Sequence, residues 1–300
     1  DTLEHAALLV IKDDSIVFEA YGDSYNENSI TNSFSMAKSF TSILIGCAID
    51  DGFITSVNDK VRKYLPQFKD NEDLTLKSLL TMSSGINFDE NYKSPIGYMA
   101  KAYYGSDLKK INEPFKVTAI PNKVFEYRGG NTLLLSFILE KATGKSISEY
   151  FSEKIWKPIG AKNTAFWSLD SENGNEKAYC CFNSNARDFA RIGKLFLNNG
   201  KWNGNQIISE SYVEQSITAA SYLVDEAGEN VDFYGYQWWV ENYKGNPVFY
   251  ARGIRGQYVI VFPNSNIILV RLGHKRLENL PNKHHTGDFY TNLEFALKFK

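Results

Sequence analysis

The segment Ser35-Met36-Ala37-Lys38 decides how the rest of this sequence is interpreted. Behind it, apolar residues recur at three- and four-residue steps, which predicts a helix over residues 36–51. Gly52 follows the last of them and suits the end of that helix. Ser35 would then stand at the helix N-terminus. Lys38, three residues on, would share its face, with about 5–6 Å between the two Cβ atoms.

A serine beside a lysine is a known arrangement for activating a hydroxyl group without histidine. The helix N-terminus adds free N–H groups and a positive dipole end, which favour a developing negative charge. The pattern alone is weak, because the chain holds a second copy, Ser106-Asp107-Leu108-Lys109, in a polar stretch. The surrounding sequence must therefore decide which of the two serines is the candidate nucleophile.

The composition is that of an ordinary globular chain. Its 300 residues are 43% hydrophobic and 23% charged, which suits one large domain or two of moderate size. The net charge of −2 gives no basic footprint for nucleic acid. The sequence contains no metal-spaced His or Cys cluster and no phosphate-binding loop, so we expect neither a metal nor a cofactor.

The cysteines and the chain start bear on the cellular compartment. The three cysteines are Cys47 and the adjacent pair Cys180-Cys181. Because neighbouring cysteines rarely bridge each other, we expect all three to be small, buried or partly buried thiols. The longest apolar runs are too short to span a bilayer. The chain begins at Asp1 and not at a methionine, so we interpret it as a processed or trimmed product. We favour an extracytoplasmic location over a cytoplasmic one.

Strands are predicted at both ends of the chain and helices between them. Runs rich in Val, Ile and aromatic residues predict strands at 6–12, 15–22, 234–240, 248–252, 257–262 and 267–272. Asp13-Asp14 reads as a two-residue hairpin turn. Helical spacing and capping residues predict helices at 75–82, 132–143, 146–156, 186–198, 210–217 and the C-terminus, with a loop-rich wall at 86–122.

This order predicts an α+β fold. Its antiparallel sheet is built from both chain ends and flanked by helices, and a mostly helical subdomain is inserted. We place the sheet region at residues 1–57 plus 184–300 and the helical insertion at 58–183. A cleft between the two is the natural place for a site.

Six segments, in order along the chain, resemble the serine β-lactamase and penicillin-binding-protein superfamily. The resemblance is strongest to its class C-like esterases and aminohexanoate-dimer hydrolases. The segments are residues 35–40, 79–85, 125–134, 154–160, 234–239 and 253–263. The resemblance implies the β-lactamase/transpeptidase-like fold and makes Ser35, rather than Ser106, the expected nucleophile.

The resemblance also implies further catalytic groups. Tyr127 matches the tyrosine of a Tyr-x-Asn or Tyr-x-Ser motif, which shares proton transfer with the lysine; a plain packing role is the alternative. Gly129 stands where the family has Asn or Ser, which removes a hydrogen bond to the lysine or the substrate. Tyr92 matches a substrate-contacting tyrosine of the amide-hydrolysing members, and packing over the cleft edge is equally expected.

The family's Lys-Thr-Gly strand motif is absent, and Ala251-Arg252-Gly253-Ile254 is its best match. By resemblance, the backbone N–H groups of Ser35 and Ile254 form the oxyanion hole, and Gly253 lets the substrate come close. Arg252 either replaces the motif's cation or is a solvated rim charge. The other substitute, His285-Thr286-Gly287, is expected to lead into the terminal helix. Of the adjacent Trp238 and Trp239, at most one can face the site.

These residues predict a serine hydrolase that cleaves carboxylic esters or amides. Ser35 would form an acyl-enzyme, and Lys38 with Tyr127 would carry out acid–base catalysis. The expected partner is a small ester, amide or peptide-like substrate. Two alternatives stay open: a non-catalytic penicillin-recognising sensor or scaffold, and a true β-lactamase or D-Ala peptidase.

Overall fold

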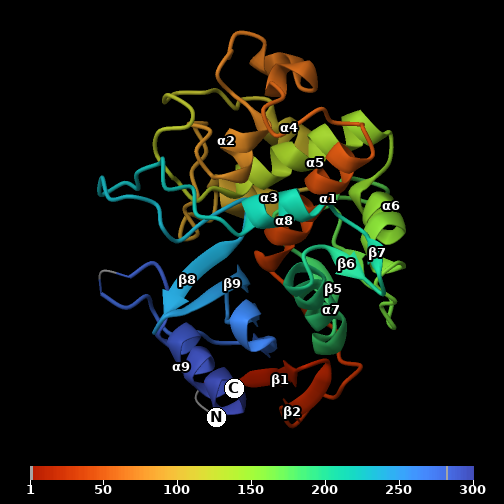
Figure 1. The fold of residues 1–300 in the computed structure, drawn as a ribbon. Helices are drawn as coiled ribbons and strands as arrows, with labels where there is room; N and C mark the ends of the chain where they lie inside the picture. Colours follow the sequence, from red (N-terminus) through yellow and green to blue (C-terminus); the bar gives the residue numbers. More distant parts are fainter. Residues whose placement is uncertain (1–2, 282) are drawn as a thin grey trace.

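A six-stranded antiparallel sheet joins the two ends of the chain. The computed structural model describes residues 3–281 and 283–300. The strand order is β2-β1-β11-β10-β9-β8, so the first hairpin pairs directly with the last strand. In Figure 1, β1 and β2, drawn in red, lie in the same half of the molecule as β8 and β9, drawn in blue. The strands are β1 (His5–Lys12), β2 (Ser15–Tyr21), β8 (Trp239–Tyr243), β9 (Asn246–Gly253), β10 (Gln257–Phe262) and β11 (Ile267–Gly273). The predicted α+β fold with a sheet from both chain ends is confirmed.

The turn between β1 and β2 follows the sequence prediction. Asp13 and Asp14 both have positive φ, at 48° and 65°. Two-residue hairpin turns with positive φ at both positions match the twist of the flanking strands, and aspartate tolerates this conformation better than most residues. Two smaller sheets complete the strands: β3 (Thr31–Asn32), β5 (Phe182–Ser184) and β4 (Phe166–Trp167) in that order, and the pair β6 (Lys201–Trp202) and β7 (Asn205–Gln206).

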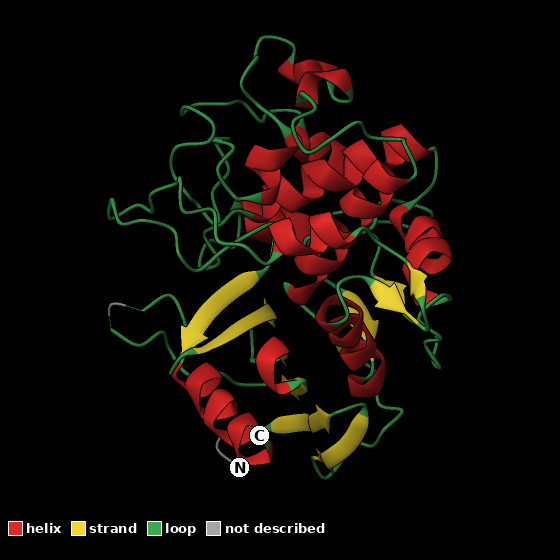
Figure 2. Ribbon diagram, in the orientation of Figure 1, coloured by secondary structure: helices red, strands yellow, loops and turns green. Residues whose placement is uncertain are grey.

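Helices cover the sheet and fill the other half of the molecule (Figure 2). The α-helices are α1 (Met36–Asp50), α2 (Leu76–Leu80), α3 (Tyr98–Tyr104), α4 (Leu108–Asn112), α5 (Gly129–Thr143), α6 (Ile147–Phe151), α7 (Ala186–Leu197), α8 (Glu210–Ser216) and α9 (Gly287–Ala296). Within the described ranges, none is both long and apolar enough to cross a membrane. Helix α7 lies close on the sheet, since a Cβ at Gly193 would be 2.9 Å from Val259 Cγ1.

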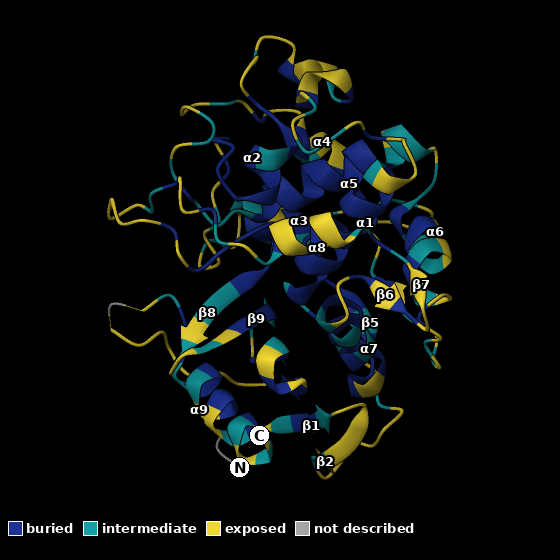
Figure 3. Cartoon of the chain, in the orientation of Figure 1, coloured by how far each residue is buried: buried dark blue, intermediate teal, exposed yellow. Residues whose placement is uncertain are grey.

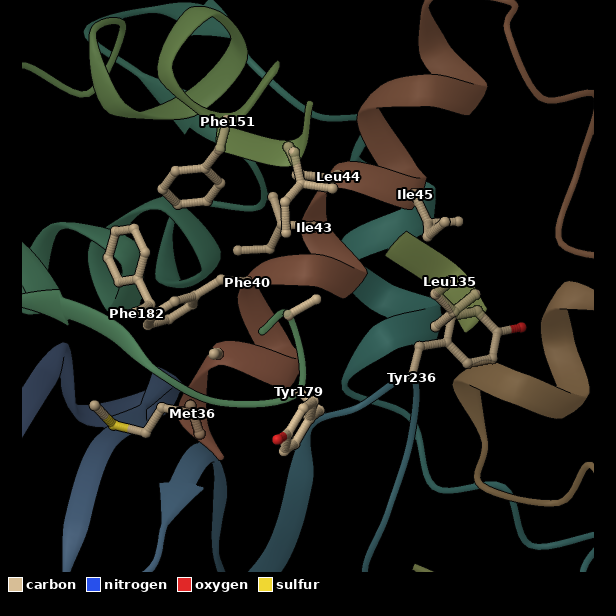
Figure 4. Packing of buried hydrophobic residues seen from close by; sticks show 14 of the residues in the cluster. Met36, Phe40, Ile43, Leu44, Ile45, Leu135, Phe151, Tyr179, Phe182 and Tyr236 are labelled. Carbon is tan, nitrogen blue, oxygen red and sulfur yellow. The ribbon is translucent and has the colours of Figure 1, made fainter. Parts of the chain in front are cut away.

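Helix α1 is the central helix. Every residue from Met36 to Ala48 is buried, whereas the edge strand β2 is largely exposed (Figure 3). Figure 4 shows Phe40 facing Phe151 and Phe182, and Ile45 pointing to the other side of the helix. A helix that is buried on all sides needs partners all round, which is why elements from both halves of the chain pack on it.

One prediction about secondary structure was wrong. Residues 234–238 are not a strand: β8 begins at Trp239, and Gln237, with φ of 63°, sits in a turn. Its N–H donates to the Leu80 carbonyl, and its own carbonyl accepts from Ser39 Oγ, so tertiary bonds replace strand pairing. Residues 86–122 hold the short helices α3 and α4, whose one or two turns are too few to give a clear period. The subdomain boundaries at 58 and 183 stay a prediction.

The prediction of three thiols was also wrong. Cys180 and Cys181 form a disulfide, and Cys47 is a buried free cysteine. Cys181 has φ of 68°, so the chain turns sharply between the two residues. Such a turn depends on the tertiary setting and leaves no signal in the cysteine spacing.

A thiol count tests this bond. Denatured without reductant, the chain should react with one equivalent of a thiol reagent, and with three after reduction, because only Cys47 is free. A Cys47→Ser variant should give no reaction before reduction. Three reactive thiols in the unreduced, air-handled protein would contradict the disulfide.

Candidate active site

A strained turn presents Ser35 at the start of α1. Phe34 has φ of 45°, a conformation that costs a bulky residue on the order of 1–3 kcal/mol. Two bonds hold the turn: the Phe34 N–H donates to Asn32 Oδ1 at 2.8 Å, and the Ser33 N–H donates to the Phe182 carbonyl at 2.8 Å. Strain of this kind persists where the surroundings fix it, and here it sets the position of the following serine.

The Ser35 hydroxyl is hydrogen-bonded to Lys38. Ser35 is the N-cap residue of α1, and its side chain makes no capping bond to the described residues of that helix. Instead, Lys38 Nζ donates to Ser35 Oγ at 3.0 Å and to the Tyr179 carbonyl at 2.9 Å. The lysine is only 1% exposed, and its Nζ lies 5.1 Å from the Tyr127 ring centre and 5.7 Å from that of Tyr179. The hydroxyl is therefore free for chemistry and in contact with a buried amine.

The second Ser-x-x-Lys copy has a different setting. Ser106 is exposed, and Asp107 rather than Ser106 caps α4. The Lys109 side chain is 64% exposed and lies 4.0 Å from Glu140. This copy is a solvated surface segment, as its polar sequence context indicated.

Tyr127 reaches the same place from the segment before α5. Its half-buried ring packs 5.5 Å from Trp239 and 6.1 Å from Tyr234, centre to centre. The preceding Glu126 N–H donates to the Met82 carbonyl at 2.8 Å, which holds the segment in place. The structure thus brings together the three residues predicted to be catalytic, Ser35, Lys38 and Tyr127.

The end of strand β9 lies against the Ser35 turn. A Cβ at Gly253 would be 2.3 Å from the Ser33 carbonyl oxygen, so only glycine allows this approach. Ile254 follows directly and leaves the strand beside that turn. The oxyanion role of the Ser35 and Ile254 amides stays a prediction, and the approach at Gly253 is the contact that supports it.

Arg252 is part of an aromatic wall. Its guanidinium carbon lies 3.5 Å from the Trp239 ring centre, and Nη1 donates to the His284 carbonyl at 2.9 Å. These two contacts hold the Arg252 side chain in place, whereas a freely solvated charge at the rim would not be held. Contact between Arg252 and substrate stays a prediction. Trp238 turns the other way and stacks on Phe196 at 4.4 Å, so only one of the paired tryptophans borders the site.

The His285-Thr286-Gly287 segment lies where the sequence placed it, at the entry to α9, with Thr286 as the N-cap residue. His285 is buried and is bonded to Tyr250 and to Glu241. These contacts fit the predicted role as a helix lead-in.

Glu90 is the residue near the site that the sequence analysis missed. Its Oε2 accepts from the Gly129 N–H at 2.6 Å, and its Oε1 accepts from the Tyr92 hydroxyl at 2.7 Å. Tyr92 is 54% exposed, and loss of hydration at its hydroxyl, followed by the Glu90 charge, raises its pKa. Gly129 was the available signal in the sequence, because a residue without a side chain leaves room for a group from another segment beside it. Whether Tyr92 contacts substrate stays a prediction.

A cavity of 730 Å³ opens beside this group and is lined by Tyr127, Glu90 and neighbouring residues. Across residues 3–281 and 283–300, no group of three or more His, Cys, Asp or Glu side chains is arranged to hold a metal ion. The arrangement provides a hydroxyl, a buried amine and a phenol, which together suit acyl transfer.

The chain is similar in sequence to proteins named as hydrolases. The chain is 25% identical over 284 residues to a 6-aminohexanoate-dimer hydrolase of Paenarthrobacter ureafaciens, covering 89% of this chain and 71% of that one. It is 31% identical over 134 residues to a teichoic acid D-alanine hydrolase of Staphylococcus aureus, covering 44% of this chain but only 31% of the relative.

Solved structures show the same fold. A Bacillus anthracis protein described as a 6-aminohexanoate-dimer hydrolase superposes with a TM-score of 0.84 at 27% identity, over 99% of this chain and 79% of that one. A penicillin-binding protein homologue from Pyrococcus abyssi gives 0.71 at 21% identity, over 97% and 72%. Residues 3–287 match the Beta-lactamase family. The chain therefore belongs to the β-lactamase family, within the superfamily of serine β-lactamases and penicillin-binding proteins.

Proposed function

We propose that this protein is a serine hydrolase that cleaves small carboxylic esters or amides through an acyl-enzyme on Ser35. The observation that carries the proposal is the 3.0 Å bond between Lys38 Nζ and Ser35 Oγ, in a serine whose hydroxyl does not cap its helix. The relatives' names support hydrolysis, and one of them denotes an amide-type dimer hydrolase.

The proposed steps use the groups around Ser35. Lys38 Nζ accepts the Ser35 proton as Oγ attacks the carbonyl carbon, and the N–H groups of Ser35 and Ile254 stabilise the oxyanion. Tyr127 passes its proton to the leaving group as the carbon–heteroatom bond breaks and receives the Ser35 proton from Lys38, which leaves the acyl group on Ser35. Water then gives a proton to Lys38 as it attacks the acyl-enzyme, and Lys38 passes that proton to Ser35 Oγ as the carboxylic acid leaves.

The alternative function is a sensor that binds acyl compounds without turnover. Gly129 and the missing Lys-Thr-Gly motif favour it, because both remove polar contacts to substrate. A sensor would be labelled by a fluorophosphonate but would not release product repeatedly.

Replacing the nucleophile gives the first functional test. Ser35→Ala should lower kcat/KM for p-nitrophenyl butyrate by at least about three orders of magnitude, since the acyl-enzyme cannot form. Ser106→Ala, in the exposed copy of the motif, should retain wild-type turnover. Loss of turnover in Ser106→Ala with normal turnover in Ser35→Ala would show that Ser106, and not Ser35, is the nucleophile.

The lysine can be tested with a similar pair. Lys38→Ala should lower the rate of fluorophosphonate labelling by about two orders of magnitude or more, because the amine that is hydrogen-bonded to Ser35 Oγ is lost. Lys109→Ala, at the exposed copy, is the matched control and should label normally. Near-normal labelling of Lys38→Ala would eliminate lysine as the base.

Substrate preference should follow from Gly129. A hydrogen bond lost to a bound polar group costs about 1–3 kcal/mol, roughly one to two orders of magnitude in kcat/KM. We expect p-nitrophenyl acetate and butyrate to be hydrolysed with higher kcat/KM than nitrocefin, because position 129 offers no side-chain partner for a β-lactam side-chain amide. Nitrocefin turnover equal to or faster than ester turnover would show that the protein is a β-lactamase.

A further inference from the structure

Two glycines at the start of α5 make room for the segment that carries Glu90. A Cβ at Gly130 would be 2.5 Å from Phe88 Cδ2, and one at Gly129 would be 3.4 Å from Glu90 Oε2. Phe88 is 3% exposed and packs against Tyr98 and Phe115, which anchors the segment. The Glu90 carboxylate therefore lies in contact with the point where a side chain of residue 129 would begin.

The carboxylate is fixed in this place. It accepts the first N–H of the 15-residue helix α5, where the helix dipole favours a negative charge, and it also accepts the Tyr92 hydroxyl. Each carboxylate oxygen can accept two hydrogen bonds, so one further acceptor position on each oxygen is available to a ligand. The group is thus ordered before any ligand binds.

Glu90 and Tyr127 line the same cavity of 730 Å³. A substrate group that enters beside the proton-donating Tyr127 therefore meets an acceptor that carries negative charge and has no proton to donate. His284, on the cavity wall, does not offset this charge, because burial lowers its pKa. The Arg128 guanidinium, also on the wall, is paired with Glu126.

Tyr179 packs against the same glycine as Glu90. It is 2% exposed, and its hydroxyl has no hydrogen-bond partner among the described residues. Its ring lies 3.4 Å from the same point above Gly129 that Glu90 approaches. Burial, followed by the nearby Glu90 charge, raises the pKa of Tyr179, so the hydroxyl stays protonated.

We propose that Glu90 is a specificity residue of the Ser35 site and selects substrates that carry a protonated amino group in the acyl chain or in the leaving group. This inference rests on the proposed function. An asparagine or serine at position 129 would offer a hydrogen-bond donor to a substrate carbonyl; the carboxylate in its place accepts from, and attracts, an ammonium group. A neutral substrate of the same shape leaves the Glu90 carboxylate without a binding partner. A site built to bind a polar substrate group discriminates against analogues that lack this group.

Matched substrate pairs test the proposal on the full chain. On the acyl side, p-nitrophenyl 7-aminoheptanoate is compared with p-nitrophenyl octanoate, in which a methyl group replaces the ammonium. On the leaving-group side, S-2-(dimethylamino)ethyl thioacetate is compared with S-3-methylbutyl thioacetate. The measured quantity is the ratio of kcat/KM, charged to neutral, because a general loss of activity cancels in it.

In the wild type, at least one pair should show a ratio of about ten or more, as for a charge-assisted hydrogen bond. The pair that shows it identifies the side of the substrate that Glu90 contacts. Glu90→Gln, which keeps the size of the side chain, should bring that ratio down to within about threefold of unity. Asp89→Asn is the matched control, since Asp89 is an exposed carboxylate on the same cavity wall.

The inference is overturned by ratios near one for both pairs in the wild type, by an unchanged ratio in Glu90→Gln, or by an equal fall in Asp89→Asn. An equal fall in Asp89→Asn would show that the ratio depends on the total negative charge of the cavity wall and not on Glu90 in particular. If Glu90→Gln does not fold, inhibition of the wild type by hexylammonium and by 1-hexanol replaces it, and only tighter inhibition by the cation supports the proposal. Turnover that persists in Ser35→Ala would instead overturn the proposed function itself.

Discussion

The buried amine of Lys38 connects three parts of the chain. Its Nζ donates to the Ser35 hydroxyl on its own helix and to the Tyr179 carbonyl 141 residues away, and the Tyr127 ring flanks it. Removing an amine from water is costly unless its hydrogen bonds are satisfied, so each of these segments must be in place for the lysine to be tolerated. The fold can be understood as the set of contacts that meets this condition.

Both halves of the molecule meet at α1. The strained turn at Phe34 is held by β5, which comes from beyond the helical region, and Gly253 brings the end of β9 against the same turn. The sheet that carries β9 is closed by pairing of the first and last strands. The position of Ser35 therefore depends on contacts from nearly the whole length of the chain, which is consistent with a family match over residues 3–287.

Local features could be predicted from the sequence, and the contacts between distant segments often could not. The apolar spacing after Ser35 predicted α1, and Asp13-Asp14 predicted the first hairpin, because both depend on neighbouring residues. The Tyr179 carbonyl is a backbone group and carries no sequence signal. The Cys180–Cys181 disulfide and the late start of β8 depend on turns that tertiary bonds stabilise. Resemblance supplied Tyr127 and Ile254, but a family pattern cannot reveal Glu90, which occupies a space that the pattern fills differently.

The account rests on Ser35 as the nucleophile, and mapping of a covalent adduct tests this most directly. The wild-type protein is treated with a fluorophosphonate, digested and sequenced by tandem mass spectrometry. The account predicts a single phosphonyl group, located on Ser35, with unmodified Ser106 in the same sample. A stoichiometric adduct on Ser106, or on any residue other than Ser35, would contradict it.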